Sequence, residues 1–180
     1  LLKNNISINA SHNITDKVKI STFANFINTD TKGRNETGYS GNLMSGFRQW
    51  WQVNVDVLEL KDAYEKLANK NITWNPADPD DMTPIYWNNL YYQRYHNYET
   101  DQKNRFIGYT QLDWEVTKFL TLTARGAVDY YHLLQEERLS VGSVAEAFGV
   151  DLSDVTSGYT LRTRTFMETN FDFLANFHKD

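Results

Sequence analysis

The sequence predicts an all-β fold with helical insertions in its loops, and three observations lead to this prediction. Five segments of the 180-residue chain alternate apolar and polar residues with a period of two. Two of the connections between these segments are tight turns, whereas the other two are long. Aromatic residues make up 14% of the chain, with eleven Tyr, ten Phe and five Trp. Together these features favour strands that form part of a transmembrane antiparallel β-barrel.

The first two predicted strands lie near residues 4–11 and 17–28, and a tight turn joins them. One face of the first strand carries Ile6 and Ile8, while asparagine and serine fill the opposite face. The second strand alternates in the same way, with Phe26 on its apolar face. Each segment therefore predicts a strand with one apolar face and one polar face.

The third and fourth predicted strands lie near residues 105–116 and 119–131 and form a second hairpin. Leu112 and Trp114 belong to the apolar face of the third strand. The turn between the two strands resembles the first turn in its pattern of residues. A fifth strand near residues 161–177 alternates phenylalanine with asparagine and aspartate.

The polar faces of the third and fourth strands carry three charged residues, Asp113, Arg125 and Asp129. In a membrane barrel, side chains on this face point into the lumen, where they would contact a plug domain or line a substrate path. A row of polar side chains facing bulk water explains the same pattern equally well, so both interpretations stay open.

The two long connections, residues 29–104 and 132–160, alternate along the chain with the two tight turns. In an antiparallel sheet, this order puts the tight turns at one end and the long loops at the other. Outer-membrane barrels have this asymmetry. A soluble β-sandwich or a lipocalin-like barrel remains the alternative, although connections of about 75 residues are rare in such folds.

Composition and motifs exclude several other classes of protein. The net charge of −5 argues against a nucleic-acid partner. The absence of cysteine removes disulfides and thiolate metal sites, and the four histidines have no metal-ligand spacing. Three aspartates at Asp78, Asp80 and Asp81 are interpreted as a solvated turn because the spacing of a calcium loop is missing. No catalytic group, metal or cofactor is expected.

The first long loop is expected to contain two helices. Asp56 lies three residues before Glu59, as in a capping box, and opens a predicted helix with Leu60 and Tyr64 on one face. A shorter helix is predicted over residues 43–51.

Aromatic side chains are concentrated in the same loop. Flat rings stack on the apolar faces of sugars and on peptide side chains at a low entropic cost. The alternative is that the rings build the core of the loop itself and a belt at the membrane interface. The residues predicted to face a ligand or a partner are Trp50, Trp51, Trp74, Tyr86, Trp87, Tyr91, Tyr92 and Tyr95.

An ordered series of short motifs runs along the chain. The first motifs are Gly46-Phe47-Arg48-Gln49-Trp50-Trp51, Asn71-Ile72-Thr73-Trp74-Asn75, Thr83-Pro84-Ile85-Tyr86-Trp87-Asn88-Asn89 and Asn104-Arg105-Phe106-Ile107-Gly108. The later ones are Gln135-Glu136-Glu137-Arg138 with Val141-Gly142-Ser143, and Asn170-Phe171-Asp172-Phe173-Leu174-Ala175-Asn176-Phe177. In this order the motifs resemble the SusC/RagA family of TonB-dependent outer-membrane transporters, and the resemblance covers nearly the whole chain. Leu67-Ala68-Asn69-Lys70 departs from the glycine-containing turn that the resemblance implies before Asn71.

The resemblance implies a 22-stranded barrel in the outer membrane of a Gram-negative bacterium, in contact with outer-membrane lipid. A SusD-like surface lipoprotein would cap the barrel, and TonB would drive uptake of an oligosaccharide or oligopeptide. The chain is expected to be an internal segment of about five strands, because no plug domain, TonB box or closing strand is recognisable. It would contact the rest of its own barrel and the plug, and reach TonB through the missing N-terminal part.

Two other functions are weighed against this one. The first is a soluble glycan-binding β-sandwich that uses Trp74 or Trp87 as a stacking platform. The second is a hydrolase built on Glu136 and Glu137, which is disfavoured because both acids fall in a predicted loop rather than on rigid strand ends. The protein is not expected to be an enzyme.

Overall fold

The computed structural model describes residues 1–34, 42–44, 47, 50–148 and 153–179, and within them the chain is mainly antiparallel β-sheet with two short helices. The all-β prediction with helical insertions is confirmed at this level. The chain divides into two compact units. The sheet unit comprises Leu1–Asp30, Gln102–Leu134 and Thr163–Asp180, and the loop unit comprises Thr31–Asp101 and Gln135–Arg162.

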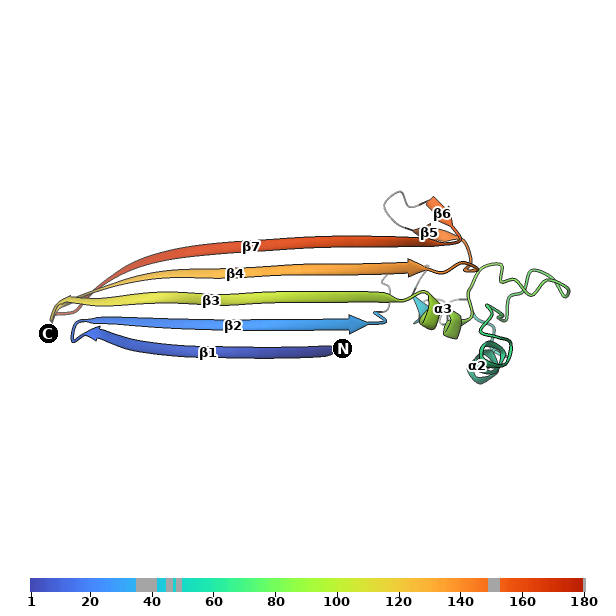
Figure 1. Ribbon diagram of the computed structural model, residues 1–180, viewed down its shortest axis with the longest axis horizontal. Coiled ribbons are helices and arrows are strands. Elements are labelled where there is room, and N and C mark those ends of the chain that lie inside the picture. The colour runs from blue at the N-terminus through green and yellow to red at the C-terminus, as the bar shows by residue number, and fades with distance from the viewer. Residues whose placement is uncertain (35–41, 45–46, 48–49, 149–152, 180) are drawn as a thin grey trace. The chain divides into compact units, whose positions relative to one another are not determined.

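Five long strands form a single antiparallel layer in the order β1-β2-β3-β4-β7 (Figure 1). Their bounds are β1 Leu2–Thr15, β2 Val18–Lys32, β3 Glu99–Thr117, β4 Leu120–Leu139 and β7 Gly158–Phe177. Each of the five predicted segments overlaps one of these strands. The strands nevertheless run well into the predicted loops, because backbone pairing continues through polar residues in which the alternation of apolar and polar side chains is lost.

The second long connection also contains structure that the sequence did not predict. Residues Glu146–Phe148 form β5 and residues Ser153–Val155 form β6, and the two pair as a small antiparallel sheet. Strands this short give too few residues for a period of two to be recognised.

The two tight turns of the sheet unit are stabilised in the same way, by a threonine at the end of the preceding strand. The Thr15 hydroxyl accepts a hydrogen bond from the backbone N–H of Lys17 at 3.2 Å. The Thr117 hydroxyl accepts hydrogen bonds from the backbone N–H groups of Phe119 and Leu120, at 3.2 and 3.1 Å. These contacts give a physical basis to the likeness between the two turn sequences, because side-chain hydroxyls of this kind stabilise turns.

Pairing between the strands sorts their side chains onto two faces. In the first hairpin, Ile6 lies opposite Phe26 and Ile8 lies opposite Ala24, so these residues share a face. We define the apolar face as the even-numbered positions of β1, β2, β3 and β4 and the odd-numbered positions of β7 in the sheet unit. Its large side chains include Ile6, Ile8, Ile20, Phe26, Phe106, Leu112, Trp114, Leu122, Val128, Tyr130, Met167, Phe171, Phe173 and Phe177.

The sheet unit has no hydrophobic core of its own among the described residues. The buried apolar side chains of the described chain are Leu60, Tyr64, Tyr92 and Leu139, and all four belong to the loop unit. By contrast, Phe173 on the apolar face is 84% exposed. The apolar face is therefore left uncovered by the described chain.

The loop unit contains two helices, each opened by a side-chain cap. Helix α2, Val57–Lys66, begins after Asp56, whose carboxylate accepts a hydrogen bond from the Leu58 N–H at 2.7 Å, in agreement with the predicted start. The helix is followed by Ala68 and Asn69, which have positive φ angles of 58° and 57°. Two left-handed residues therefore replace the glycine that commonly ends a helix. No described helix is both long and apolar enough to cross a membrane.

The predicted helix over residues 43–51 is only partly observed. Leu43, Met44 and Phe47 are helical, whereas Trp50 lies in a turn, so the helix ends earlier than predicted. Residues 45–46 and 48–49 lie outside the described residues. The sequence pattern predicted too long a helix, because a tryptophan continues the apolar periodicity equally well inside a helix and beyond its end.

Asn89 joins the parts of the loop unit. Its side chain is fully buried and caps helix α3, Leu90–His96, by accepting a hydrogen bond from the Tyr91 N–H at 2.8 Å. Its amide nitrogen donates to the carbonyl of Leu60 at 2.8 Å and to that of Ile72 at 2.7 Å. One side chain thus connects α2, the following loop and α3.

Replacing Asn89 with alanine should destabilise the loop unit by about 3–5 kcal/mol. The change removes the hydrogen bonds that this buried side chain donates to the Leu60 and Ile72 carbonyls, and it also removes a helix cap. Urea unfolding followed by tryptophan fluorescence measures the effect. The exposed Asn54→Ala serves as the matched control, and a shift no larger than the control's would contradict the assigned role of Asn89.

Candidate functional site

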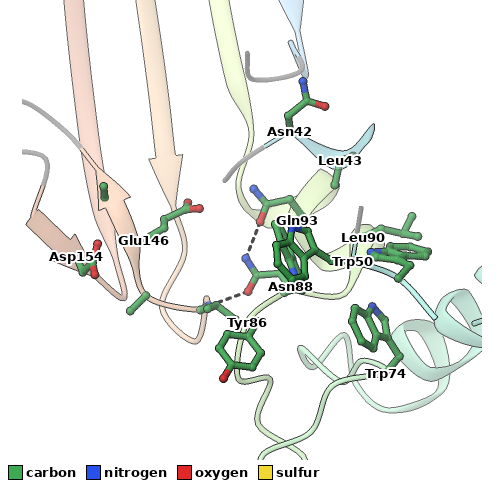
Figure 2. Close-up of a pocket in the computed structure, with 15 residues that line it drawn as sticks. Asn42, Leu43, Trp50, Trp74, Tyr86, Asn88, Leu90, Gln93, Glu146 and Asp154 are labelled. Atoms are coloured by element: carbon green, nitrogen blue, oxygen red, sulfur yellow. Dashed lines mark hydrogen bonds between the residues drawn. The ribbon is translucent and has the colours of Figure 1, made fainter. Parts of the chain in front are cut away.

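The loop unit encloses a cavity of about 710 Å³ whose walls are rich in tryptophan (Figure 2). Five of the eight aromatic residues predicted to face a ligand line this cavity: Trp50, Trp51, Trp74, Tyr86 and Trp87. Their rings support one another, because the Trp51 ring lies 6.4 Å from the Trp74 ring, centroid to centroid. Trp50 and Tyr86 remain 52% and 72% exposed, which leaves ring surface available for a ligand.

The other three predicted aromatic residues lie on α3 and pack against other rings of the loop unit, although Tyr95 is 64% exposed. Tyr91 and Tyr95 stack against Tyr64 with centroid distances of 6.4 and 5.8 Å. Tyr92 stacks on His96 at 4.4 Å and is buried. None of the three is among the residues that line the cavity. Burial raises the pKa of Tyr64 above its ordinary value, which keeps this phenol neutral within the cluster of rings.

A chain of amide side chains forms one polar part of the cavity wall. The Asn88 carbonyl oxygen accepts hydrogen bonds from the Asn71 amide and the Val144 N–H, both at 2.7 Å. The Asn88 amide nitrogen donates to the Gln93 side-chain carbonyl oxygen at 2.7 Å (Figure 2). Asn97 donates to the same oxygen at 2.9 Å. The orientation of the Gln93 amide is therefore fixed, with its nitrogen left for other partners.

The β5–β6 hairpin contributes the acidic part of the wall. Glu146 lies on β5 and Asp154 on β6, and both residues are part of the cavity lining (Figure 2). Sequence reasoning missed these two acids together with Asn88 and Gln93. Asparagine and glutamine are common throughout this chain, and only the folded hydrogen-bond network distinguishes the ones that line the cavity.

A second polar cluster in the loop unit is centred on Arg34. Its guanidinium lies 2.8 Å from Glu99, 3.1 Å from Asp101 and 3.0 Å from Glu137. Burial acts to lower the pKa of Arg34, but the three carboxylates outweigh burial and raise the pKa above its ordinary value. Arg34, which follows β2 after Gly33, thereby links residues from the start of β3 and the end of β4.

Glu136 and Glu137, the acids considered for a hydrolase, have different partners. Glu137 binds Arg34, whereas Glu136 accepts a hydrogen bond from the Tyr159 hydroxyl at 3.3 Å. Both residues lie on β4 rather than in the predicted loop, because β4 extends to Leu139. Successive residues of a strand point to opposite faces, so the two carboxylates do not converge on one point.

The three charged residues predicted to face a lumen lie on the polar face of the sheet unit, and each has a partner there. Asp113 accepts hydrogen bonds from Thr123 at 2.6 Å and from Gln111 at 3.0 Å. Arg125 pairs with Asp172 at 2.7 Å, and Asp129 forms an ion pair with Arg105. The polar face is thus crossed by charge pairs that link β3 to β4 and β4 to β7.

The aspartates near residue 80 form a turn. The Asp78 carboxylate accepts hydrogen bonds from the backbone N–H groups of Asp80 and Asp81, at 2.7 and 3.1 Å. Hydrogen bonds from the side chain and backbone of Thr83 lower the pKa of Asp81. Within the described residues, no group of three or more potential ligands could hold a metal ion.

Comparison with known proteins assigns no family to the chain. No protein-family model matches its sequence, and no curated protein matches it either. The case for a function therefore rests on the sheet and on the cavity.

Arg34→Met should destabilise the loop unit by about 2–3 kcal/mol, because it removes the guanidinium that lies between three carboxylates, of which Glu99 is nearly buried. The double variant Arg34→Met/Glu99→Gln should recover part of the loss. Urea unfolding at pH 7 measures both effects. Equal stability of Arg34→Met and the parent chain would show that the cluster contributes nothing.

Proposed function

We propose that this chain is a segment of an outer-membrane importer that takes up oligosaccharides or oligopeptides. The sheet unit would form part of a barrel wall, and the loop unit would form the part that contacts ligand. The observation that carries this proposal is the uncovered apolar face, which is opposed by a polar face crossed by ion pairs. A strand in a barrel that spans a membrane alternates in this way between lipid and lumen.

The apolar face needs an apolar neighbour. Burying one large apolar side chain contributes about 1.5–3 kcal/mol, so a face with fourteen such side chains is strongly unfavourable in water. A β-sandwich would supply a second sheet, but the only other sheet among the described residues is β5–β6 with three residues in each strand. Lipid acyl chains would cover the face without any further protein layer.

A row of asparagine side chains supports the position of one edge of the part of the apolar face that would contact lipid. On the apolar face, Asn4 donates a hydrogen bond to Asn28 at 3.4 Å, and Asn28 donates to Asn104 at 3.0 Å. From this row towards the tight turns, residues 106–116 of β3 provide a stretch that matches the roughly 9–11 residues of a tilted membrane-spanning strand. The amides would then lie at the level of the lipid headgroups.

The polar face fits an aqueous lumen. The ion pair between Arg125 and Asp172 is about half exposed, with 47% and 54% of the two side chains accessible to solvent. Charged pairs of this kind are tolerated beside water and are costly beside hydrocarbon. In this proposal Asp113, Arg125 and Asp129 face the water-filled interior or a plug domain.

The partners follow from the family resemblance and from the cavity. A SusD-like surface lipoprotein would cap the loop unit, and TonB would act through a plug domain elsewhere in the protein. The chain itself would perform no chemical reaction. A soluble glycan-binding module is the second candidate. The tryptophan-rich cavity favours this candidate, because a cavity of this kind can bind a ligand without a membrane.

Single cysteines labelled with a fluorophore would test which face meets lipid, since the chain contains no cysteine. In the full chain reconstituted into phosphatidylcholine vesicles, labels at Leu112 and Trp114 should be quenched by lipid-attached nitroxides. Labels at the neighbouring Asp113 and Glu115 should be quenched by a water-soluble agent instead. Equal aqueous quenching at all four positions would overturn the proposal and favour the soluble module.

A further inference from the structure

The cavity of the loop unit has an amide strip on its wall, in which Asn88 and Gln93 are held by hydrogen bonds. The cavity volume of about 710 Å³ lies within the roughly 300–1,000 Å³ of ordinary ligand sites. From the direction of the donor in this strip we infer that the cavity binds an N-acetylated sugar, with Gln93 donating to the acetamido carbonyl. This inference rests on the proposed function and names the substrate class within it.

Two backbone N–H groups fix the neighbours of Gln93. The Asn88 side-chain oxygen accepts from the Val144 N–H at 2.7 Å, and the Asn97 side-chain oxygen accepts from the Ser140 N–H at 2.7 Å. A backbone N–H can only donate, so the oxygen of each amide has to face it. The nitrogens of Asn88 and Asn97 then both donate to the Gln93 side-chain oxygen, at 2.7 and 2.9 Å.

The Gln93 amide is consequently held in one orientation. A flip would turn its N–H groups towards two other donors and lose both hydrogen bonds. The Gln93 side-chain nitrogen makes no hydrogen bond within the described chain, and Gln93 lines the cavity (Figure 2). A donor that is already oriented can bind a ligand oxygen with little further ordering, which favours affinity.

The side-chain oxygens of the strip are already occupied. The Asn88 oxygen accepts from the Val144 N–H and from the Asn71 amide, both at 2.7 Å. The Gln93 oxygen accepts from Asn88 and Asn97. An amide oxygen has two lone pairs, so both oxygens are fully used. A ligand hydroxyl at this strip would find a donor for its oxygen but no acceptor for its proton, whereas a carbonyl oxygen needs only the donor.

The tryptophan wall fits the rest of an acetamido sugar. Trp51, Trp74 and Trp87 line the same cavity, and flat rings of this kind pack against the C–H faces of sugar rings and against a methyl group. A carboxylate fits the strip less well, because its charged oxygens need several donors and the strip has one free nitrogen. A peptide also carries carbonyls, but an extended peptide is usually held by a row of backbone groups along a strand edge, whereas this strip consists of side chains.

A matched series of trisaccharides tests this inference. Cellotriose, the glucosamine trimer and the N-acetylglucosamine trimer share one backbone and differ only in carrying a hydroxyl, an amine or an acetamide on each ring. Binding to the full chain in detergent is measured by calorimetry, with trigalacturonate and a library of acetylated tripeptides as further ligands. The acetamido trimer should bind at least about tenfold more tightly than every other ligand.

Gln93→Glu is the sharpest variant, because one carboxylate oxygen can still accept from Asn88 and Asn97 while the free donor becomes an acceptor. It should weaken binding of the acetamido trimer about tenfold and remove the advantage of this trimer over cellotriose. The matched control Gln52→Glu, an exposed residue outside this cavity, should leave both unchanged. Calorimetry gives the fraction of competent protein separately from the dissociation constant, so partial unfolding of a variant cannot imitate weaker binding.

Four results would overturn the inference. They are that the acetamido trimer does not bind, that cellotriose, the glucosamine trimer or trigalacturonate binds as tightly, that only peptides bind, or that Gln93→Glu behaves like its control.

This binding assay and the vesicle assay fail independently. Selective binding of the acetamido trimer without lipid quenching would leave the site intact and remove the importer. Lipid quenching on the apolar face without binding of this trimer would leave the barrel segment and remove this choice of ligand.

Discussion

The alternation of side chains along five paired strands is the constraint on which the rest of the structure depends. It collects phenylalanine, leucine, isoleucine and tryptophan on one face of a single sheet layer, while the buried apolar side chains of the described chain all lie in the loop unit. A layer of this kind is not stabilised by its own interior. We propose that its apolar face meets an external apolar medium and that the opposite face, with Arg105–Asp129 and Arg125–Asp172, meets an aqueous one. Membrane and lumen would satisfy both conditions with one sheet.

The loop unit is stabilised differently from the sheet unit. Hydrogen bonds of amide side chains order it around a small aromatic core. Asn89 satisfies backbone groups on three segments, and Asn88 with Gln93 forms a polar strip beside the tryptophan wall. Arg34 neutralises carboxylates where β2, β3 and β4 enter this unit. These contacts join helices, strand ends and irregular segments, and the loop unit holds Trp50, Trp74 and Trp87 around a cavity.

Much of the sheet could be predicted from the sequence, and rather little of the cavity. Ile6, Ile8 and Phe26 indicate their strands because a period of two is visible in single residues, and Asp56 indicates α2 because a cap has a local signature. The polar strand ends beyond Asp30 and before Gln102 have no such period, so their pairing was missed. The loop aromatics were identified as a group, but only packing separates Trp50 and Trp87, which line the cavity, from Tyr91 and Tyr95, which stack on Tyr64. The role of Gln93 depends on which way its amide is turned, and no sequence pattern records that.

The dependence of the sheet on an apolar medium is tested most directly by amide hydrogen exchange in the full chain, with and without phosphatidylcholine vesicles. The account predicts that amides of β1, β2, β3, β4 and β7 in the sheet unit are protected in vesicles and exchange rapidly in water. Amides of the loop-unit core, such as Leu60 and Tyr92, should be protected to a similar degree under both conditions. Strong protection of the five strands in a monomer free of lipid and detergent would contradict the account, because it would show that the sheet is stable with its apolar face in water.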